Sequence, residues 1–249
     1  MTAGLPAEPP DECVRWCEAN DYRITVDDDL AEIDLDWWNG HLKSYRIPVR
    51  LWGRTIDGTP TDCGAGFLRR SDINGSLPEQ GPADLCVLYR AAAWLTGHPR
   101  RFHTRRFPDV GTSNRAGEFA EITTALQTCR EQHPANLDPG PYRSWSGWPR
   151  TPGVGPAVLS LYCWAVREDT PERPQLLDQH SLATLCHLGW LQIPSITTFT
   201  RNRYLRYNQL LHDWALHTQI PPELIEMWLA HNWEQRTRNA RNHLGVDQR

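Results

Sequence analysis

The chain has 249 residues, which is enough for one large domain or two small ones with an apolar core and excludes a peptide scaffold. Hydrophobic residues make up 39% and charged residues 22%, a composition that excludes disorder of the whole chain. No apolar run approaches the roughly 20 residues of a membrane helix, and residues 1–13 lack the basic and apolar parts of an export signal. We therefore expect a cytoplasmic protein that does not contact a membrane.

The formal net charge of -4 is distributed unevenly along the chain. Residues 1–40 contain eleven Asp or Glu and two Arg, a local charge of -9 that leaves +5 for the remainder. An acidic segment attached to a mildly basic body is compatible with nucleic-acid binding through one face. The overall charge therefore does not exclude a DNA partner.

The cysteines and histidines predict neither a disulfide framework nor a metal site. The seven cysteines form no CxxC pair, and the ten histidines form no HExxH motif. We interpret the cysteines as thiols of the core and expect no metal and no cofactor.

The pattern of elements changes near residue 80. Residues 1–80 are rich in turn signals, at 27–29, 39–40, 57–58 and 74–75, with strand-like pieces at 22–26 and 45–52. This segment is predicted to contain short strands and loops. Residues 81–249 are predicted to form a helical domain, so the chain is mainly α; the helices are expected at 84–95, which is apolar nearly all round, and at 116–132, 156–167, 178–188, 200–218 and 222–236.

One turn indicates a binding function. In the sequence TPGVGP, residues 151–156, Gly153 and Gly155 flank Val154, and Pro156 opens the next helix. Such a turn leaves backbone N–H groups free at the positive end of a helix dipole, where a phosphate can bind. An ordinary junction between a loop and a helix has the same appearance, so the turn alone does not decide the function.

A second motif, LLDQH at residues 176–180, follows the first at a defined spacing. Asp178 comes 23 positions after Gly155, beyond a helix and a loop that contains proline. This arrangement resembles the helix-hairpin-helix DNA glycosylases, a superfamily that includes endonuclease III and the 8-oxoguanine glycosylases. The resemblance extends over residues 83–235 and does not cover residues 1–80.

The resemblance implies a helix-hairpin-helix fold and a double-stranded DNA substrate that holds a damaged or modified base. It implies that Asp178 is the catalytic residue and that residues 153–156, which are Gly153, Val154, Gly155 and Pro156, contact the DNA backbone. A carboxylate suits this chemistry, because cleavage of an N-glycosidic bond builds positive charge on the sugar. The alternative interpretation of Asp178 is a helix N-cap, and the two roles are compatible.

The chain departs from the superfamily at the position of the lysine nucleophile. Bifunctional members carry this lysine two residues after the second glycine, where this chain has Ala157, and Lys43 is its single lysine. A Schiff base at that position is impossible. Residues 142–150, where a helix should precede the hairpin, contain Gly147 and Pro149, and no iron–sulfur cysteine cluster is present.

Further candidate contacts lie in two places. The segment 98–107 is rich in arginine and is predicted to bind DNA phosphates, although a solvated loop is the alternative; its candidates are Arg100, Arg101, Arg105 and Arg106. The candidates for a base pocket are Trp145, Trp148 and His180.

The leading hypothesis is a monofunctional base-excision glycosylase with a role in DNA repair. The alternatives are a catalytically silent DNA-binding or adaptor module of the same fold, and an N-glycosidase that acts on a free nucleoside or nucleotide. Whether Asp178 faces an open cavity or is buried as a cap discriminates between catalysis and a silent module.

Overall fold

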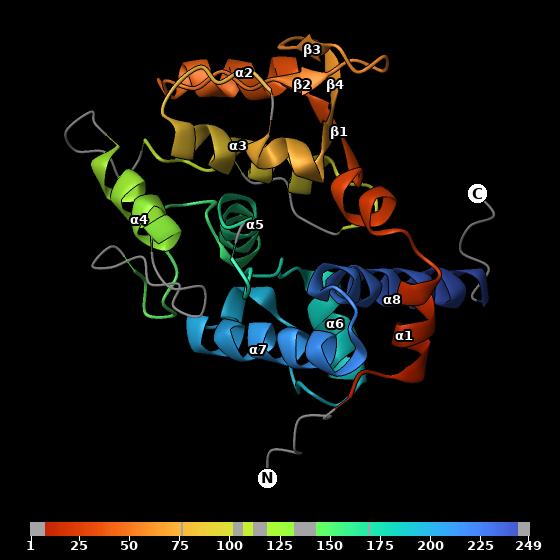
Figure 1. The fold of residues 1–249 in the computed structure, drawn as a ribbon. Helices are drawn as coiled ribbons and strands as arrows, with labels where there is room; N and C mark the ends of the chain where they lie inside the picture. The colour runs from red at the N-terminus through yellow and green to blue at the C-terminus, as the bar shows by residue number, and fades with distance from the viewer. Residues whose placement is uncertain are drawn as a thin grey trace.

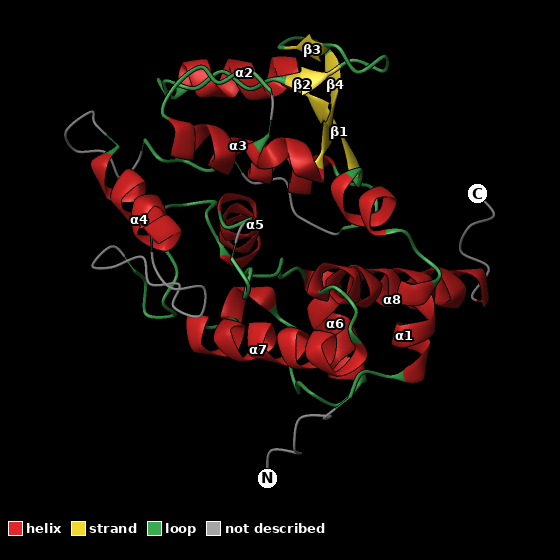
Figure 2. Ribbon diagram, in the orientation of Figure 1, coloured by secondary structure: helices red, strands yellow, loops and turns green. Residues whose placement is uncertain are grey.

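The computed structural model describes residues 8–75, 77–101, 107–111, 119–131, 143–168 and 170–243. The fold is mainly helical, with one small antiparallel sheet near the N-terminus (Figure 2), as the sequence predicts. Within the described residues, no helix is both long enough and apolar enough to cross a membrane.

The sheet has four strands in the order β1-β4-β2-β3. Strand β1 pairs antiparallel with β4 in a register that places Leu30 opposite Arg69. Strand β4 also pairs antiparallel with β2, which forms a short hairpin with β3. Gly58, at φ +88°, forms the turn of that hairpin, where a turn is predicted at 57–58. The strands are β1 (Leu30–Asp34), β2 (Gly53–Arg54), β3 (Pro60–Thr61) and β4 (Ala65–Arg69).

The N-terminal segment has the predicted short strands and loops and also contains helices, which the sequence did not predict. Residues 39–40, predicted as a turn, lie inside helix α2, where the side chain of Asn39 bonds both backbone groups of Leu51 and so fixes the helix against its neighbour. The helical elements of this segment are α1 (Asp11–Glu18), the π-helical turn η1 (Arg23–Asp27), α2 (Leu35–Ser44) and the 3₁₀ turn η2 (Arg70–Asn74).

Both predicted strands of this segment are absent. Residues 22–26 run into η1, in which Val26 is the buried side chain. Residues 45–52 do alternate, with Ile47, Val49 and Leu51 buried. Of this stretch, Arg50 alone forms a bridge, to Gln80, so the alternating pattern packs on the core without a neighbouring strand.

The helical body agrees more closely with the prediction. In Figure 1, α5 lies between a layer that contains the sheet, α2 and α3 and a layer formed by α1, α6, α7 and α8. The helices are α3 (Ala83–Gly97), α4 (Ala120–Glu131), α5 (Pro156–Val166), α6 (Gln179–His187), α7 (Arg201–Thr218) and α8 (Pro222–His243), with a short 3₁₀ turn η4 (Ile196–Thr198) before α7.

The core is built around α3 and α5, the two most apolar helices. Every residue from Leu85 to Leu95 is buried, which confirms the prediction of a buried helix at 84–95. The apolar cluster includes residues from both the N-terminal segment and the helical body. Five of the seven cysteines are buried free thiols; Cys186 is half-buried and Cys63 is exposed.

Candidate active site

The glycine turn before α5 has the local geometry that the sequence predicts. Gly153 has φ +80°, and a Cβ built on it would lie 2.4 Å from the carbonyl oxygen of Phe107, so a side chain has no room there. Gly155, the N-cap of α5, has extended backbone and offers no side-chain cap. A Cβ at Gly155 would meet no atom within 4 Å. The turn therefore presents the open start of a helix to the space beside it.

That space is a cavity of about 420 Å³, and it joins the two motifs. The turn residues Gly153 to Ala157 form one part of its wall, and Asp178 at the start of α6 forms another. The remaining lining residues are Ser144, Ser146, Trp148, Pro149, Gln179, Ile196 and Thr197. The two motifs thus meet at one cavity.

Asp178 caps α6 and lines the cavity at the same time. Its Oδ1 accepts a hydrogen bond of 2.7 Å from the Ser181 amide, and its Oδ2 accepts one of 2.8 Å from Nη1 of Arg101. The residue is 2% exposed. Burial alone would raise the pKa of Asp178, but the charge of Arg101 and the Ser181 amide outweigh it, and the pKa lies below its usual value. The carboxylate is therefore ionised at neutral pH.

Among the described residues, none that lines the cavity carries an amine. Ala157, two residues after Gly155, is buried and contributes a methyl group to the cavity. Lys43 lies exposed on α2 and is not among the lining residues. No side chain that lines this cavity can form a Schiff base.

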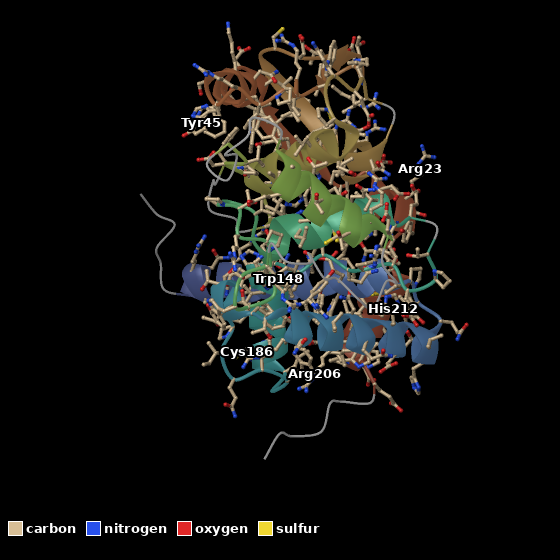
Figure 3. The ribbon with its side chains drawn as sticks, turned by 90° about the vertical axis from the view of Figure 1, so that its left-hand side faces the viewer. Arg23, Tyr45, Trp148, Cys186, Arg206 and His212 are labelled. Atoms are coloured by element: carbon tan, nitrogen blue, oxygen red, sulfur yellow. The ribbon has the colours of Figure 1, made fainter. Side chains whose placement is uncertain are left out.

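Of the three base-pocket candidates, Trp148 alone lies at the cavity. It is buried, and its Nε1 donates a hydrogen bond of 2.6 Å to the carbonyl oxygen of Phe199; Figure 3 labels it at the level between α5 and α7. Trp145 is 85% exposed, in the turn that the bridge between Arg143 and Pro149 closes. His180 shares a hydrogen bond of 3.0 Å between its Nδ1 and the carbonyl oxygen of Arg100 and does not line the cavity.

Two of the four candidate arginines after α3 lie in the described residues, and both form ion pairs with carboxylates. Arg100 has a half-exposed side chain that donates to Asp29. Arg101 is buried, and its Nη1 donates to two carboxylates, Asp178 and Glu226, so its guanidinium faces the interior instead of solvent. The other two candidates, Arg105 and Arg106, lie outside the described residues.

The segment before the turn is not helical where it is described. Residues 143–149 form a tight turn in which the Ser144 amide donates to the Trp148 carbonyl oxygen, and the Arg201 amide donates to Ser146. Gly147 has φ +88° and packs on the Cβ of Arg201. The described part of residues 142–150 thus forms a turn, and not a helix, before α5.

Sequence reasoning missed two residues connected to the site. Glu226 of α8 is fully buried and bonds Arg101 and Arg70, and Arg70 is fully buried in η2. A lone carboxylate inside the apolar run 224–230 was the available signal, because such a residue is seldom buried without a partner. Across the described ranges, no group of three or more His, Cys, Asp or Glu is arranged to hold a metal ion.

Comparison with protein families decides the relationship. A family model described as "Putative 8-oxoguanine DNA glycosylase OGG-like protein" matches residues 24–230, most of the chain. The chain belongs to this family. The match of the OGG-like family starts at residue 24, so the prediction that the resemblance excludes residues 1–80 is wrong for residues 24–80, and β1, β4 and η2 are part of the family's unit. No curated protein and no solved structure matches the chain.

Proposed function

We propose that the chain is a monofunctional DNA N-glycosylase, which releases a damaged or modified base from double-stranded DNA and leaves an abasic site without cutting the strand. The family description suggests 8-oxoguanine as the base. The observation that carries the proposal is the cavity in which an ionised Asp178 and the turn before α5 meet, with Ala157 in place of an amine.

The proposed reaction is a hydrolysis. The bond between C1′ of the deoxyribose and the base nitrogen breaks, and its electron pair leaves with the base. Asp178 stabilises the positive charge that develops on the sugar. Water adds its oxygen to C1′ and loses one proton, and the released base gains a proton. No covalent bond to the protein forms.

The proposed DNA contacts belong to the turn before α5 and to the arginine-rich segment after α3. The first-turn amides of α5 have no side-chain cap and lie at the positive end of the helix dipole, where they would bind a backbone phosphate. Arg100, with the candidates Arg105 and Arg106, would add cationic contacts. Because such contacts release counterions, the affinity should fall steeply as the salt concentration rises.

The test is release of free base from duplexes that contain 8-oxoguanine or other damaged bases. Asp178→Asn should lose at least about a hundredfold in rate, because an amide can still cap α6 but cannot balance a sugar cation. Asp34→Asn is the matched control, since Asp34 caps α2 by the same kind of bond, to the Trp37 amide, and lies away from this cavity. Borohydride should trap no adduct. Full activity of Asp178→Asn would refute the catalytic role.

One observation favours a second candidate, the silent DNA-binding module. Both oxygens of Asp178 already accept hydrogen bonds, from Ser181 and Arg101. If wild-type protein binds duplex DNA but releases no base from any duplex in the panel, this candidate becomes the better account. Release of base from free 8-oxo-deoxyguanosine alone would instead favour a nucleosidase.

A further inference from the structure

Four buried side chains of alternating charge form a row that ends at the cavity. Nη1 of Arg70 lies 2.7 Å from Oε2 of Glu226, whose Oε1 lies 2.6 Å from Nη1 of Arg101. The same Nη1 of Arg101 lies 2.8 Å from Oδ2 of Asp178. The row brings together η2, α8, the segment after α3 and the cap of α6, and all four residues are at least nine-tenths buried.

The two ends of the row have different surroundings. Arg70 is held away from the cavity, with its guanidinium carbon 4.2 Å from the ring centroid of Trp164. Asp178, at the other end, lines the cavity. Along this row of hydrogen bonds, Glu226 therefore lies between Arg70 and the two residues nearer to the cavity, Arg101 and Asp178.

The sharing of Arg101 has an electrostatic consequence. An arginine that served Asp178 alone would cancel most of its field, and a neutralised carboxylate attracts a sugar cation weakly. Glu226 accepts from the same nitrogen, so Asp178, Arg101 and Glu226 together carry one net negative charge, and Arg70, which brings the row of four to neutrality, is the last of the four in the order of hydrogen bonds from the cavity. Such a buried charge is screened less than a charge at the surface.

We infer that Glu226 is a positioning residue for catalysis, which acts through Arg101 and leaves Asp178 with an effective negative charge toward the sugar. This inference rests on the proposed glycosylase function and extends it to a second carboxylate that does not touch the substrate. In Glu226→Gln, the charge of Arg101 would act on Asp178 without a competing anion.

The test compares two abasic-site analogues in otherwise identical duplexes: a cationic pyrrolidine, which carries the charge of the sugar cation, and a neutral tetrahydrofuran. Wild-type protein should bind the cationic duplex more tightly. Glu226→Gln should lose about tenfold of that preference, the order of effect expected for one interior charge, while its affinity for the neutral duplex stays unchanged. The single-turnover rate of base release should fall by a similar factor.

Glu223→Gln is the matched control, because Glu223 lies on the same helix, is buried and pairs with Arg173 at 3.6 Å, outside the row. It should keep the preference. Glu226→Gln leaves Arg70 buried without its carboxylate and could unfold the protein, so the double variant Arg70→Gln/Glu226→Gln, which removes both charges, is measured beside it. The double variant should fold. Its preference for the cationic duplex should be at least about threefold smaller than that of wild type.

The outcomes separate this inference from the proposed function. If wild-type protein shows no preference for the cationic duplex and releases no base, the proposed function fails and the role of Glu226 fails with it. If wild type prefers the cationic duplex, Asp178→Asn loses that preference and the folded Glu226 variants keep it, the glycosylase proposal survives and the role of Glu226 is refuted.

Discussion

Nη1 of Arg101 lies 2.8 Å from Oδ2 of Asp178, so a predicted phosphate contact and the predicted catalytic residue form one buried ion pair. Arg101→Met should destabilise the fold by about 3–5 kcal/mol, because it leaves two buried carboxylates, those of Asp178 and Glu226, without their shared cation. Urea unfolding measures this loss. Arg100→Met, which removes a half-exposed partner of Asp29, should cost at most about 1 kcal/mol. Equal losses in the two variants would contradict the structure at this pair.

The two glycines of the turn should separate folding from binding. Gly153→Ala places a Cβ against the backbone of Phe107 at a positive φ, so it should lower the free energy of unfolding by more than about 1 kcal/mol. Gly155→Val meets open space, and the protein should unfold at nearly the wild-type urea concentration. Its side chain would enter the cavity and weaken binding to every duplex sequence alike, because the turn contacts the backbone and not the bases. Binding of Gly155→Val at wild-type affinity would argue against the turn as a DNA contact.

The two tryptophans beside the turn should respond in opposite ways. Trp145→Ala should leave stability unchanged, since the side chain is exposed, and lower the affinity for DNA, because stacking on a base contributes about 1–3 kcal/mol. Trp148→Ala empties a buried site at the cavity wall and should cost about 3–5 kcal/mol of stability. Calorimetry and fluorescence anisotropy with a labelled duplex measure the two effects. A Trp145→Ala variant that binds like wild type would exclude Trp145 from the interface.

Stability should decrease as the pH falls from 7.5 to 5.5. Burial lowers the pKa of His98 and outweighs the attraction of Asp29, whose Oδ1 lies 2.9 Å from its Nε2; burial also lowers the pKa of His231. The unfolded chain then binds more protons than the native state below about pH 6.5, so each proton taken up on unfolding changes the stability by up to about 1.4 kcal/mol per pH unit. Urea midpoints at several pH values measure the slope. His98→Gln should reduce it; a flat profile in wild type would contradict the shifted pKa values of His98 and His231.

Local sequence determined the parts of the site that depend on one segment. Gly153 has a positive φ, and α5 is apolar all round. The turn and the helix could therefore be predicted from the sequence. The sequence indicated Asp178 both as a helix cap and as a motif residue. In the structure it caps α6 through a hydrogen bond from the Ser181 amide, and it lines the cavity.

The rest depends on contacts between distant segments. A cluster of arginines in a polar stretch predicts side chains exposed to solvent. Arg101, however, is 77 residues from Asp178 and 125 from Glu226 in the sequence, and no local pattern indicates that it contacts them. Asn39 and Gly40 are a turn signal by type, yet the bonds from Asn39 to Leu51 and Asp62 stabilise a helix there. In both cases tertiary hydrogen bonds override the local preference.

Lys43, the single lysine of the sequence, lies exposed on α2 and does not line the cavity. Because the 249 residues contain a single ε-amino group, a reagent that acylates amines would modify one lysine side chain per chain, at a defined place, besides any free N-terminal amine. A fluorophore on Lys43 could report the approach of labelled DNA by energy transfer without a substitution in the protein. The many arginines, which such reagents leave unmodified, would keep their charge throughout the measurement.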